Sequence, residues 1–318
     1  MRGLGLAIVL AVLSAGCLGG SLVDARVSEA RDAEGALDTL HDYEIGQSAA
    51  QARVANLEGL YAASGGDSRV ALLLARAWTK LTFEFTLDDY ERALENGDSP
   101  AENYQRLRAQ AGFRRGQFYA DAWLERRAPG FGAALGDDQA LAGWLTRSVR
   151  DADAAEALLW AGLSRIGDAD AAQPEAAASS AEKVRRVGAI LLRHSLSLSS
   201  TAASGLGHLG LALAAASGAA ADLGLVEREL ALAESAARGR LLVPLFRARM
   251  LACKRDDRRG FERDLDRILR ESDPAPALRL ENVVAKRRAR RYLTSHVVGA
   301  ECFDAAKTDA PRGAPAAR

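Results

Sequence analysis

GLGHLGLALAAASGAAADLGLVERELALAESAARG, residues 205–239, opens the stretch that decides the fold. Apolar residues recur in it at the three- and four-residue spacing of an α-helix with one buried face. We expect two helices, one ending at Gly218 and the other at Gly239, because glycine commonly follows a helix end. The positions predicted to be buried are Leu206, Leu209 and Leu213 in the first helix, and Val226, Leu230, Ala233 and Ala237 in the second.

The same spacing continues toward the C-terminus and predicts three further helices. The third begins at Leu241, the fourth contains Phe261–Leu269, and the fifth runs from Leu278 to Tyr292. The first and third helices begin at Gly205 and Leu241, a separation close to the roughly 34-residue unit of tetratricopeptide (TPR) repeats. The sequence therefore predicts an all-α fold of stacked TPR-like helix–turn–helix repeats, an α-solenoid or superhelix.

The composition favours helices and gives no electrostatic reason for nucleic-acid binding. Ala, Leu, Arg and Glu dominate the 318 residues, and all four are good helix formers. Alternating apolar and polar runs are scarce, so we expect almost no sheet. Basic and acidic residues number 42 each, which gives a formal net charge of zero and argues against a nucleic-acid partner.

The N-terminus has the features of a bacterial lipoprotein signal. Residues 1–16 are predicted to be a signal peptide, because one arginine precedes a short apolar run that is too short to span a membrane. LSAGC at residues 13–17 resembles a lipobox, which makes Cys17 the lipidation site. An ordinary signal peptide cut near Ala15 is the alternative. Residues 17–25 would be a lipidated tether, and Leu18 after the cysteine favours the inner leaflet of the outer membrane, facing the periplasm.

Residues 26–303 are predicted to form a single TPR-like helical domain. It divides into an N-terminal half at 26–168 and a C-terminal half at 179–303, with the Ala-rich segment 169–178 as the candidate linker. The Ala- and Pro-rich tail at 304–318 is expected to be disordered.

Two long helices are predicted in the N-terminal half. The first runs from Val70 to about Glu95. SPAE at residues 99–102 is a capping box with proline at the first helical position, and it opens a helix that reaches about Arg127.

The helical stretches resemble those of a known family. ALLWAGL at 157–163, LGHLG at 206–210, FRAR at 246–249, LENVVA at 280–285 and RARRYL at 288–293 are similar in order and spacing to the T component (TatT) of tripartite ATP-independent periplasmic (TRAP) transporters. The resemblance covers roughly half of the chain after the signal peptide. It implies an all-helical, TPR-like protein without catalytic residues, which associates with the periplasmic solute-binding protein of the transporter.

The resemblance also implies an apolar or organic-acid ligand and the capacity to form a homotrimer. A general TPR-like scaffold lipoprotein in cell-envelope assembly remains the alternative function. A cofactor-binding oxidoreductase is a third hypothesis, because GLGHLG at 205–210 matches G-x-G-x-x-G. That motif requires a preceding strand, and the serine-rich residues 195–204 make a poor one. We therefore expect close helix packing there and no cofactor.

No metal or catalytic site is predicted. The four histidines, His41, His194, His208 and His296, are scattered and do not pair with cysteine or carboxylate at a metal-ligand spacing. Cys253 and Cys302 are the cysteines left after Cys17, and a disulfide between them and two separate buried thiols remain alternatives.

Asn282 lies on the apolar stripe of the fifth helix, so we expect it to point inward and to bond backbone groups of the loop Asp273–Ala277. The basic residues at 286–288 and 290–291 are interpreted as a solvated helix face that nearby acids such as Glu281 balance.

The N-terminal half also contains a group of aromatic residues. Most are expected in the core, and the family resemblance suggests that some line an apolar ligand channel. The candidates for the channel are Trp78, Phe83, Phe85, Phe118 and Trp123.

Overall fold

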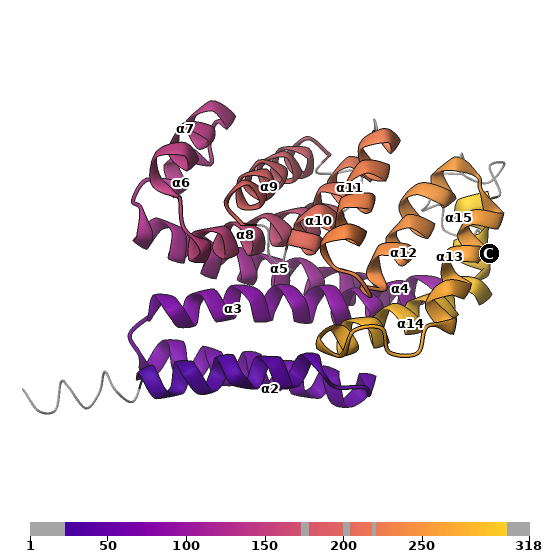
Figure 1. Cartoon of the computed structure of the whole chain (residues 1–318), viewed down its shortest axis with the longest axis horizontal. Helices are drawn as coiled ribbons and strands as arrows, with labels where there is room; N and C mark the ends of the chain where they lie inside the picture. Colours follow the sequence, from indigo (N-terminus) through magenta and orange to yellow (C-terminus); the bar gives the residue numbers. More distant parts are fainter. Residues whose placement is uncertain (1–22, 173–177, 200–203, 218–220, 304–318) are drawn as a thin grey trace, which may run out of the picture.

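The computed structural model describes residues 23–172, 178–199, 204–217 and 221–303, and these residues are helical with no strand among them (Figure 1). Cys17, the predicted signal peptide and the tail at 304–318 lie outside these ranges. The tether was expected to reach residue 25, but a helix already spans residues 23–38, because the apolar residues that begin with Val23 and Val27 have helical spacing. Within the described ranges, no helix is long and apolar enough to cross a membrane.

The first helices after residue 38 lie side by side and are joined by short turns (Figure 1). They are α2 (Tyr43–Ala63), α3 (Ser68–Leu81), the π-helical turn η1 (Thr82–Thr86), α4 (Leu87–Glu95) and α5 (Ser99–Arg127). Aspartates cap three of these helices: Asp42 accepts from the Ile45 N–H, Asp67 from Arg69 and Asp98 from Ala101.

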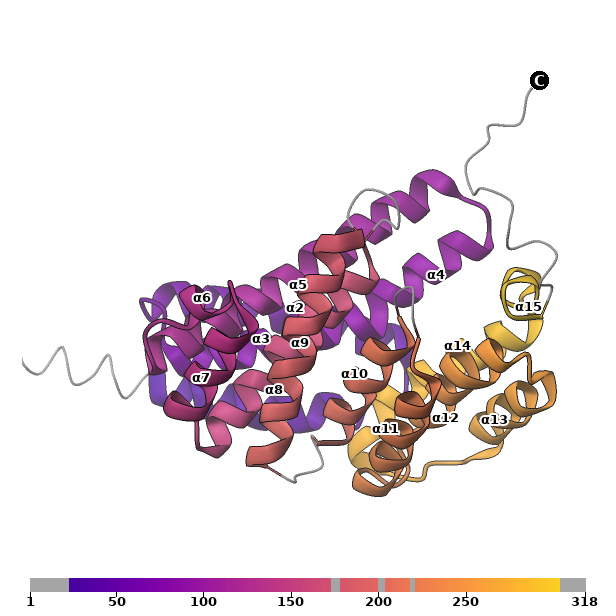
Figure 2. The same ribbon diagram turned by 90° about the horizontal axis from the view of Figure 1, so that it is seen from above.

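The remaining elements continue the array, and Figure 2 shows α8 to α13 following one another across the molecule. They are α6 (Phe131–Ala134), α7 (Asp138–Ser148), α8 (Ala152–Asp170), α9 (Ala178–Leu198), α10 (Ser204–Ala216), α11 (Leu223–Ala236), α12 (Leu242–Phe246), the π-turn η2 (Arg247–Ala252), the 3₁₀ turn η3 (Cys253–Arg255), α13 (Arg258–Arg270), the 3₁₀ turn η4 (Pro276–Leu278), α14 (Arg279–Thr294) and α15 (His296–Phe303). A disulfide joins Cys253 at η3 to Cys302 in α15.

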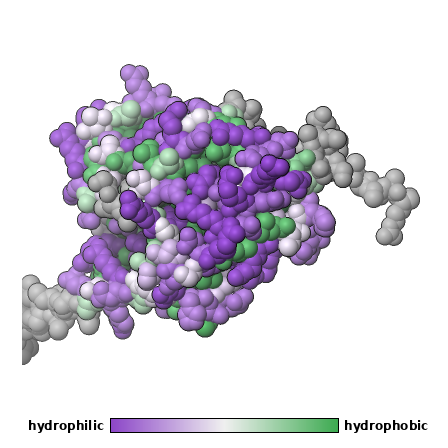
Figure 3. All heavy atoms as spheres, turned by 45° about the vertical axis from the view of Figure 1, so that its right-hand side comes forward, coloured by the Kyte–Doolittle hydropathy of each residue, from purple (hydrophilic) through white to green (hydrophobic). Residues whose placement is uncertain are grey.

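The last helices return to the first ones. Consecutive pairs pack together, α8 with α9, α10 with α11 and α13 with α14, but α14 also contacts α2 and η1. Figure 1 shows α14 beside the ends of α2 and α3, although it lies about 200 residues later in the chain. On the face drawn in Figure 3, hydrophilic side chains predominate and hydrophobic ones lie between them, as expected when the apolar stripes face inward.

The helix predicted from Val70 to Glu95 is interrupted by the π-turn η1. One extra residue in a turn rotates all later side chains by about 100° relative to a regular α-helix. Phe83 and Glu84 consequently lie on an internal cavity, whereas Phe85 is buried against the ring of Tyr43, with 5.2 Å between the ring centroids. The hydrophobic spacing alone did not indicate this change of register.

A buried carboxylate, Asp88 of α4, holds α14 against the N-terminal helices. Its side chain is 0% exposed, and it accepts hydrogen bonds from Tyr43 Oη and Arg287 Nε, each at 3.0 Å. Arg291 donates a further hydrogen bond, and Arg288 Nε lies 3.7 Å from Asp88 Oδ1. The contact therefore joins α2, α4 and α14 at one point.

The interpretation of the basic cluster in α14 as a solvated face is wrong for two of its arginines. Arg288 is only 2% exposed, and Arg291 is largely buried against Glu91 and Glu95. The sequence shows the positive charges on one helix, but it does not show that the acids of α4 lie opposite them.

The arginines also set the ionisation of Asp88. Burial by itself would raise the pKa of this carboxyl, but the charges of Arg288 and Arg291 outweigh burial and hold the pKa below its usual value. A carboxyl whose pKa is lower in the folded state stabilises the fold above its unfolded pKa of about 3.9. That stabilisation is lost as the pH falls through the folded pKa.

Asn282 in α14 points inward but bonds other partners than predicted. Its Oδ1 accepts from the Leu241 N–H at 2.8 Å, and its Nδ2 donates to the Gly239 carbonyl at 2.9 Å. The amide therefore bonds the turn between α11 and α12 and not the loop Asp273–Ala277. Gly239 has a φ of 85°, a conformation that glycine adopts without strain. A Cβ there would lie 3.1 Å from the Pro274 carbonyl oxygen, so the turn at Gly239 lies between Asn282 and the loop Asp273–Ala277. Helical spacing fixes the face of a residue but not the neighbour it meets.

Replacing Asp88 should destabilise the protein strongly. Asp88→Asn removes the fully buried counter-charge that the arginines of α14 share, and we expect it to lower the free energy of unfolding by about 3–5 kcal/mol in chemical denaturation. Glu227→Gln, which removes an exposed ion pair with Arg255, is the control and should change stability little. Equal denaturation midpoints for Asp88→Asn and the wild type would contradict the role given to this contact.

Asn282→Ala should also destabilise the fold, because it leaves a buried N–H and a buried carbonyl without a partner. We expect a loss of about 1–3 kcal/mol in the free energy of unfolding. Asn103→Ala, at an exposed position of α5, is the matched control and should change the free energy by less than about 0.5 kcal/mol. If the two variants unfolded at the same denaturant concentration, the two hydrogen bonds of Asn282 would not be contributing.

Candidate functional site

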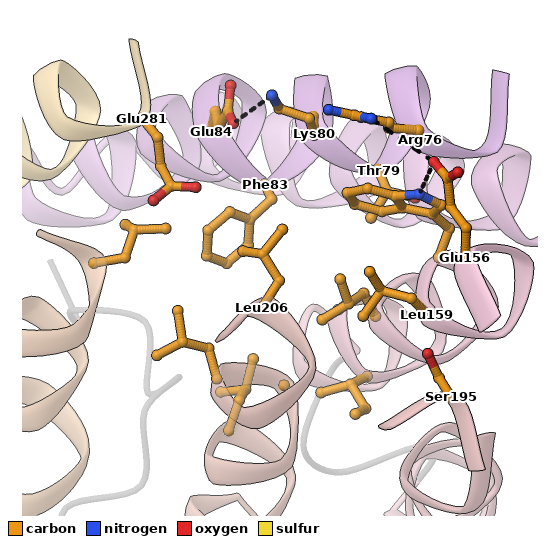
Figure 4. A pocket seen from close by; sticks show the side chains of 18 of the residues that line it. Arg76, Thr79, Lys80, Phe83, Glu84, Glu156, Leu159, Ser195, Leu206 and Glu281 are labelled. Atoms are coloured by element: carbon orange, nitrogen blue, oxygen red, sulfur yellow. Dashed lines mark hydrogen bonds and ion pairs between the residues drawn. The ribbon is translucent and has the colours of Figure 1, made fainter. Parts of the chain in front are cut away.

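A cavity of about 490 Å³ lies inside the helical array (Figure 4). Side chains from α3, η1, α8, α10, α12 and the start of α14 line it. Its volume falls in the usual range for small-molecule sites, about 300–1,000 Å³. Because α14 reaches it from the far end of the chain, the cavity depends on the contact between the first and last helices.

Most of the wall is apolar. The α10 stripe predicted from the sequence, Leu206, Leu209 and Leu213, lies on the cavity. Other apolar side chains complete the wall from neighbouring helices: Leu159, Leu163 and Ile166 of α8, Leu242 and Phe246 of α12, Phe83 of η1 and Phe113 of α5. Figure 4 shows Phe83 and Leu206 close together. Moving an apolar chain from water onto such a wall is favourable, so the cavity suits a ligand that has one.

The segment GLGHLG lies within α10, where its glycines permit close packing. A Cβ at Gly210 would lie only 2.7 Å from Leu163 Cδ2 and from Leu192 Cδ1. A Cβ at Gly205 would lie 2.8 Å from that of Ala237. Helix packing against α8, α9 and α11 therefore explains these small residues, and a phosphate-binding turn is not needed to account for them.

Charged side chains line the edge of the cavity. Arg76, Lys80 and Glu84 follow each other at four-residue spacing along α3 and η1, as Figure 4 shows. Glu156 of α8 lies 3.7 Å from Arg76 and accepts a 3.2 Å hydrogen bond from the indole of Trp160.

The edge is completed by groups from three other elements. Arg240, in the turn before α12, pairs with Glu281 of α14. Asp38, from the helix at residues 23–38, pairs with Lys80. The cavity therefore has an apolar body that is bordered by charged side chains.

The surroundings of Glu84 change its ionisation. It is 4% exposed, and burial raises its pKa to about 7; the ammonium of Lys80 opposes the shift and the carboxylate of Glu281 adds to it. Burial also raises the pKa of Glu281, against the opposing charges of Arg240 and Lys80. A buried carboxyl that titrates near neutral pH within a cavity is a candidate functional group.

Of the five aromatic residues proposed for a channel, Phe83 lines the cavity and the other four do not. Phe85 and Trp123 are buried in the core, and Trp78 donates its indole N–H to Glu58. Phe118 is 52% exposed on the outer side of α5. These four side chains lie away from this cavity because closeness in sequence does not place helical residues on one face, and the π-turn separates Phe83 from Phe85.

Sequence reasoning missed the charged residues of the cavity. A signal was available, since Arg76, Lys80 and Glu84 recur at four-residue spacing beside the apolar stripe of the same helix. A charged row bordering an apolar one marks the edge of a buried face. Nothing local, however, shows that Asp38, Arg240 and Glu281 lie opposite that row.

The chemistry of this site suits binding. Among the described residues, neither histidine nor cysteine lines the cavity, and no group of three or more metal-ligating side chains is present. Ser195 lines it, but its hydroxyl donates to the Ala155 carbonyl at 2.6 Å. The arrangement provides an apolar wall bordered by charged side chains, which are the features that hold and orient a ligand.

Comparison with known proteins gives one family match. The family model for the TRAP transporter T-component matches residues 40–297, which contain the cavity-lining residues apart from Asp38. A search of curated proteins found no match.

The raised pKa of Glu84 predicts a pH-dependent effect of Glu84→Gln on stability. A carboxyl whose folded pKa lies above its unfolded value favours the fold at low pH, and this advantage is lost as the pH rises through the folded pKa. Glutamine stays neutral, so the variant should be more stable than the wild type by up to about 3 kcal/mol above about pH 7, with little difference at about pH 4. Thermal unfolding across this pH range measures the effect.

Glu262→Gln, at an exposed position of α13, is the control and should follow the wild type at every pH. A constant difference between Glu84→Gln and the wild type over the whole range would show that Glu84 does not titrate as described.

Proposed function

Because the chain belongs to the TRAP transporter T-component family, we propose that it is a non-enzymatic accessory protein of a TRAP-type transporter. The match over residues 40–297 carries this proposal. In this proposed role, the protein binds the periplasmic solute-binding protein of the transporter and holds an apolar or organic-acid ligand in its cavity. The apolar walls contributed by α8, α10 and α12 support the ligand-binding part.

The proposal also places the protein in the cell envelope. Cys17 in LSAGC would carry the lipid anchor, and the chain would face the periplasm from the inner leaflet of the outer membrane. The consecutive packing of α10 with α11 and of α13 with α14 supports stacked TPR-like repeats as the architecture of the partner-binding surface. Trimer formation remains a prediction from the family resemblance.

Co-purification tests the transporter role. The tagged full-length chain, expressed in its native envelope and solubilised, should bring down the solute-binding protein of a TRAP transporter, and the two should elute together in size-exclusion chromatography. Recovery of outer-membrane assembly proteins in its place would contradict the transporter role and favour the general scaffold.

Filling the cavity tests the ligand-binding role. Leu206→Trp adds an indole to the apolar wall, and we expect it to weaken binding of the neutral fluorescent probe N-phenyl-1-naphthylamine by about tenfold or more, measured by fluorescence titration. Leu232→Trp is the matched control, because Leu232 is 49% exposed on α11 and does not line the cavity. Equal affinities in the wild type and Leu206→Trp would show that the probe binds elsewhere.

A further inference from the structure

One ion pair on the cavity has matched charges but incomplete hydrogen bonding. Arg240, in the turn before α12, donates from Nη1 to Oε2 of Glu281 in α14. Two further atoms of this pair, Arg240 Nε and Glu281 Oε1, are buried and have no hydrogen-bond partner among the residues that the structure describes. The pair therefore leaves one N–H donor and one carboxylate acceptor unsatisfied.

Both side chains belong to the wall of the cavity. Arg240 is 5% exposed and Glu281 is 7% exposed, and both line the cavity. Figure 4 shows the carboxylate of Glu281 directed into the cavity on the side of Phe83. Buried polar atoms without partners cost stability, so a ligand group that satisfied them would be held at this point.

A third buried atom on the cavity, Arg76 Nε, also lacks a hydrogen bond within the described part of the chain. It lies against Oε1 of Glu34, and the same guanidinium is 3.7 Å from Glu156. The charge of Arg76 is therefore matched on two sides. The pair of Arg240 and Glu281 is the place where a ligand head would gain most.

A charged head would find its counter-charge already taken there. Glu281 is the counter-charge of Arg240. Lys80, a second cation near Glu281, pairs with Asp38 and lies 3.9 Å from Glu84. A carboxylate beside Arg240 would meet the negative charge of Glu281, and an ammonium beside Glu281 would meet the guanidinium. An uncharged hydrogen-bonding group meets neither repulsion.

We propose, on the basis of the ligand-binding function above, that the ligand is an uncharged amphiphile with a hydroxylated head and an aliphatic chain. The hydroxyl donates its hydrogen to Glu281 Oε1, and an oxygen of the same head accepts from the Nε–H of Arg240. The chain lies along the apolar wall of α8 and α10, which includes Leu159 and Leu206. Within the ligand class named above, the inference selects the apolar, uncharged members.

Nonan-1-ol and its isomer 1-methoxyoctane test the hydroxyl directly. The two have the same atoms and each has one oxygen acceptor, but the alcohol alone can donate a hydrogen bond. Each is titrated against the full chain loaded with N-phenyl-1-naphthylamine, and loss of probe fluorescence reports binding. The alcohol should bind about tenfold more tightly than the ether, as a hydrogen bond to a charged acceptor predicts. Octane-1-sulfonate and octyltrimethylammonium, which carry fixed charges, should both bind more weakly than the alcohol.

A double variant locates the hydroxyl. Arg240→Met combined with Glu281→Leu replaces the buried ion pair by apolar side chains, a change that is often neutral or stabilising. The variant should still bind the ether, which also shows that it is folded, and should bind the alcohol no more tightly than the ether. Arg255→Met combined with Glu227→Leu removes an exposed ion pair away from the cavity and should keep the wild-type preference.

The outcomes separate this inference from the proposed function. Equal affinities of the wild type for the alcohol and the ether would overturn the hydroxylated head, as would tighter binding of either charged probe than of the alcohol. A preference for the alcohol that survives in the folded double variant would also overturn it. Ligand binding would stand in each case. If the double variant did not fold, the comparison in the wild type would still decide. If none of these compounds binds, the ligand-binding function fails and the inference fails with it.

Discussion

The carboxylate of Asp88 is the contact on which the arrangement of the helices depends. It is fully buried, and it receives a tyrosine hydroxyl from α2 and arginines from α14, a helix about 200 residues later in the chain. Neighbouring helices of an array contact each other without a buried ion pair of this kind, because their apolar stripes are adjacent in sequence. A contact between the first and last helices needs a specific interaction, and a buried acid opposite several arginines provides one.

The cavity depends on this contact between α14 and the first helices. Its apolar wall is local, since it comes from α8 and α10, which pack through α9 and the glycines of α10. Its charged border combines residues that are far apart in the sequence, since Asp38 comes from the first described helix and Glu281 from α14. The π-turn η1 sits between these parts and carries Phe83, whose ring points into the cavity, and Glu84, at its charged border (Figure 4). Buried polar atoms that lack partners cost stability in a core, and three of the atoms on this cavity, Arg76 Nε, Arg240 Nε and Glu281 Oε1, have no hydrogen-bond partner among the described residues.

The sequence predicted what depends on neighbours along the chain. The helix at 99–127 begins and ends where the capping box and the apolar spacing placed it, and the inward direction of Asn282 followed from its place on a stripe. The stripe at Leu206, Leu209 and Leu213 was also predicted, although its role as a cavity wall was not.

The failures share one cause, which is that they involve residues brought together by the fold. The arginines of α14 were interpreted as solvated because the acids that face them lie in α4. The partners of Asn282 lie in another turn than the one expected, and of the five aromatic candidates for a channel, Phe83 lines this cavity. A single extra residue in a helical turn, at η1, was enough to separate Phe83 from Phe85.

The central claim is that closure of the helical array creates an internal ligand site, and crystallography with a heavy-atom ligand tests it most directly. Crystals of the chain bound to 10-bromodecan-1-ol would locate the bromine by its anomalous scattering. The account predicts a peak inside the cavity between α3, α8 and α10, beside Leu206 and Phe83. A peak found only on the outer face of α5, near the exposed ring of Phe118, would contradict it.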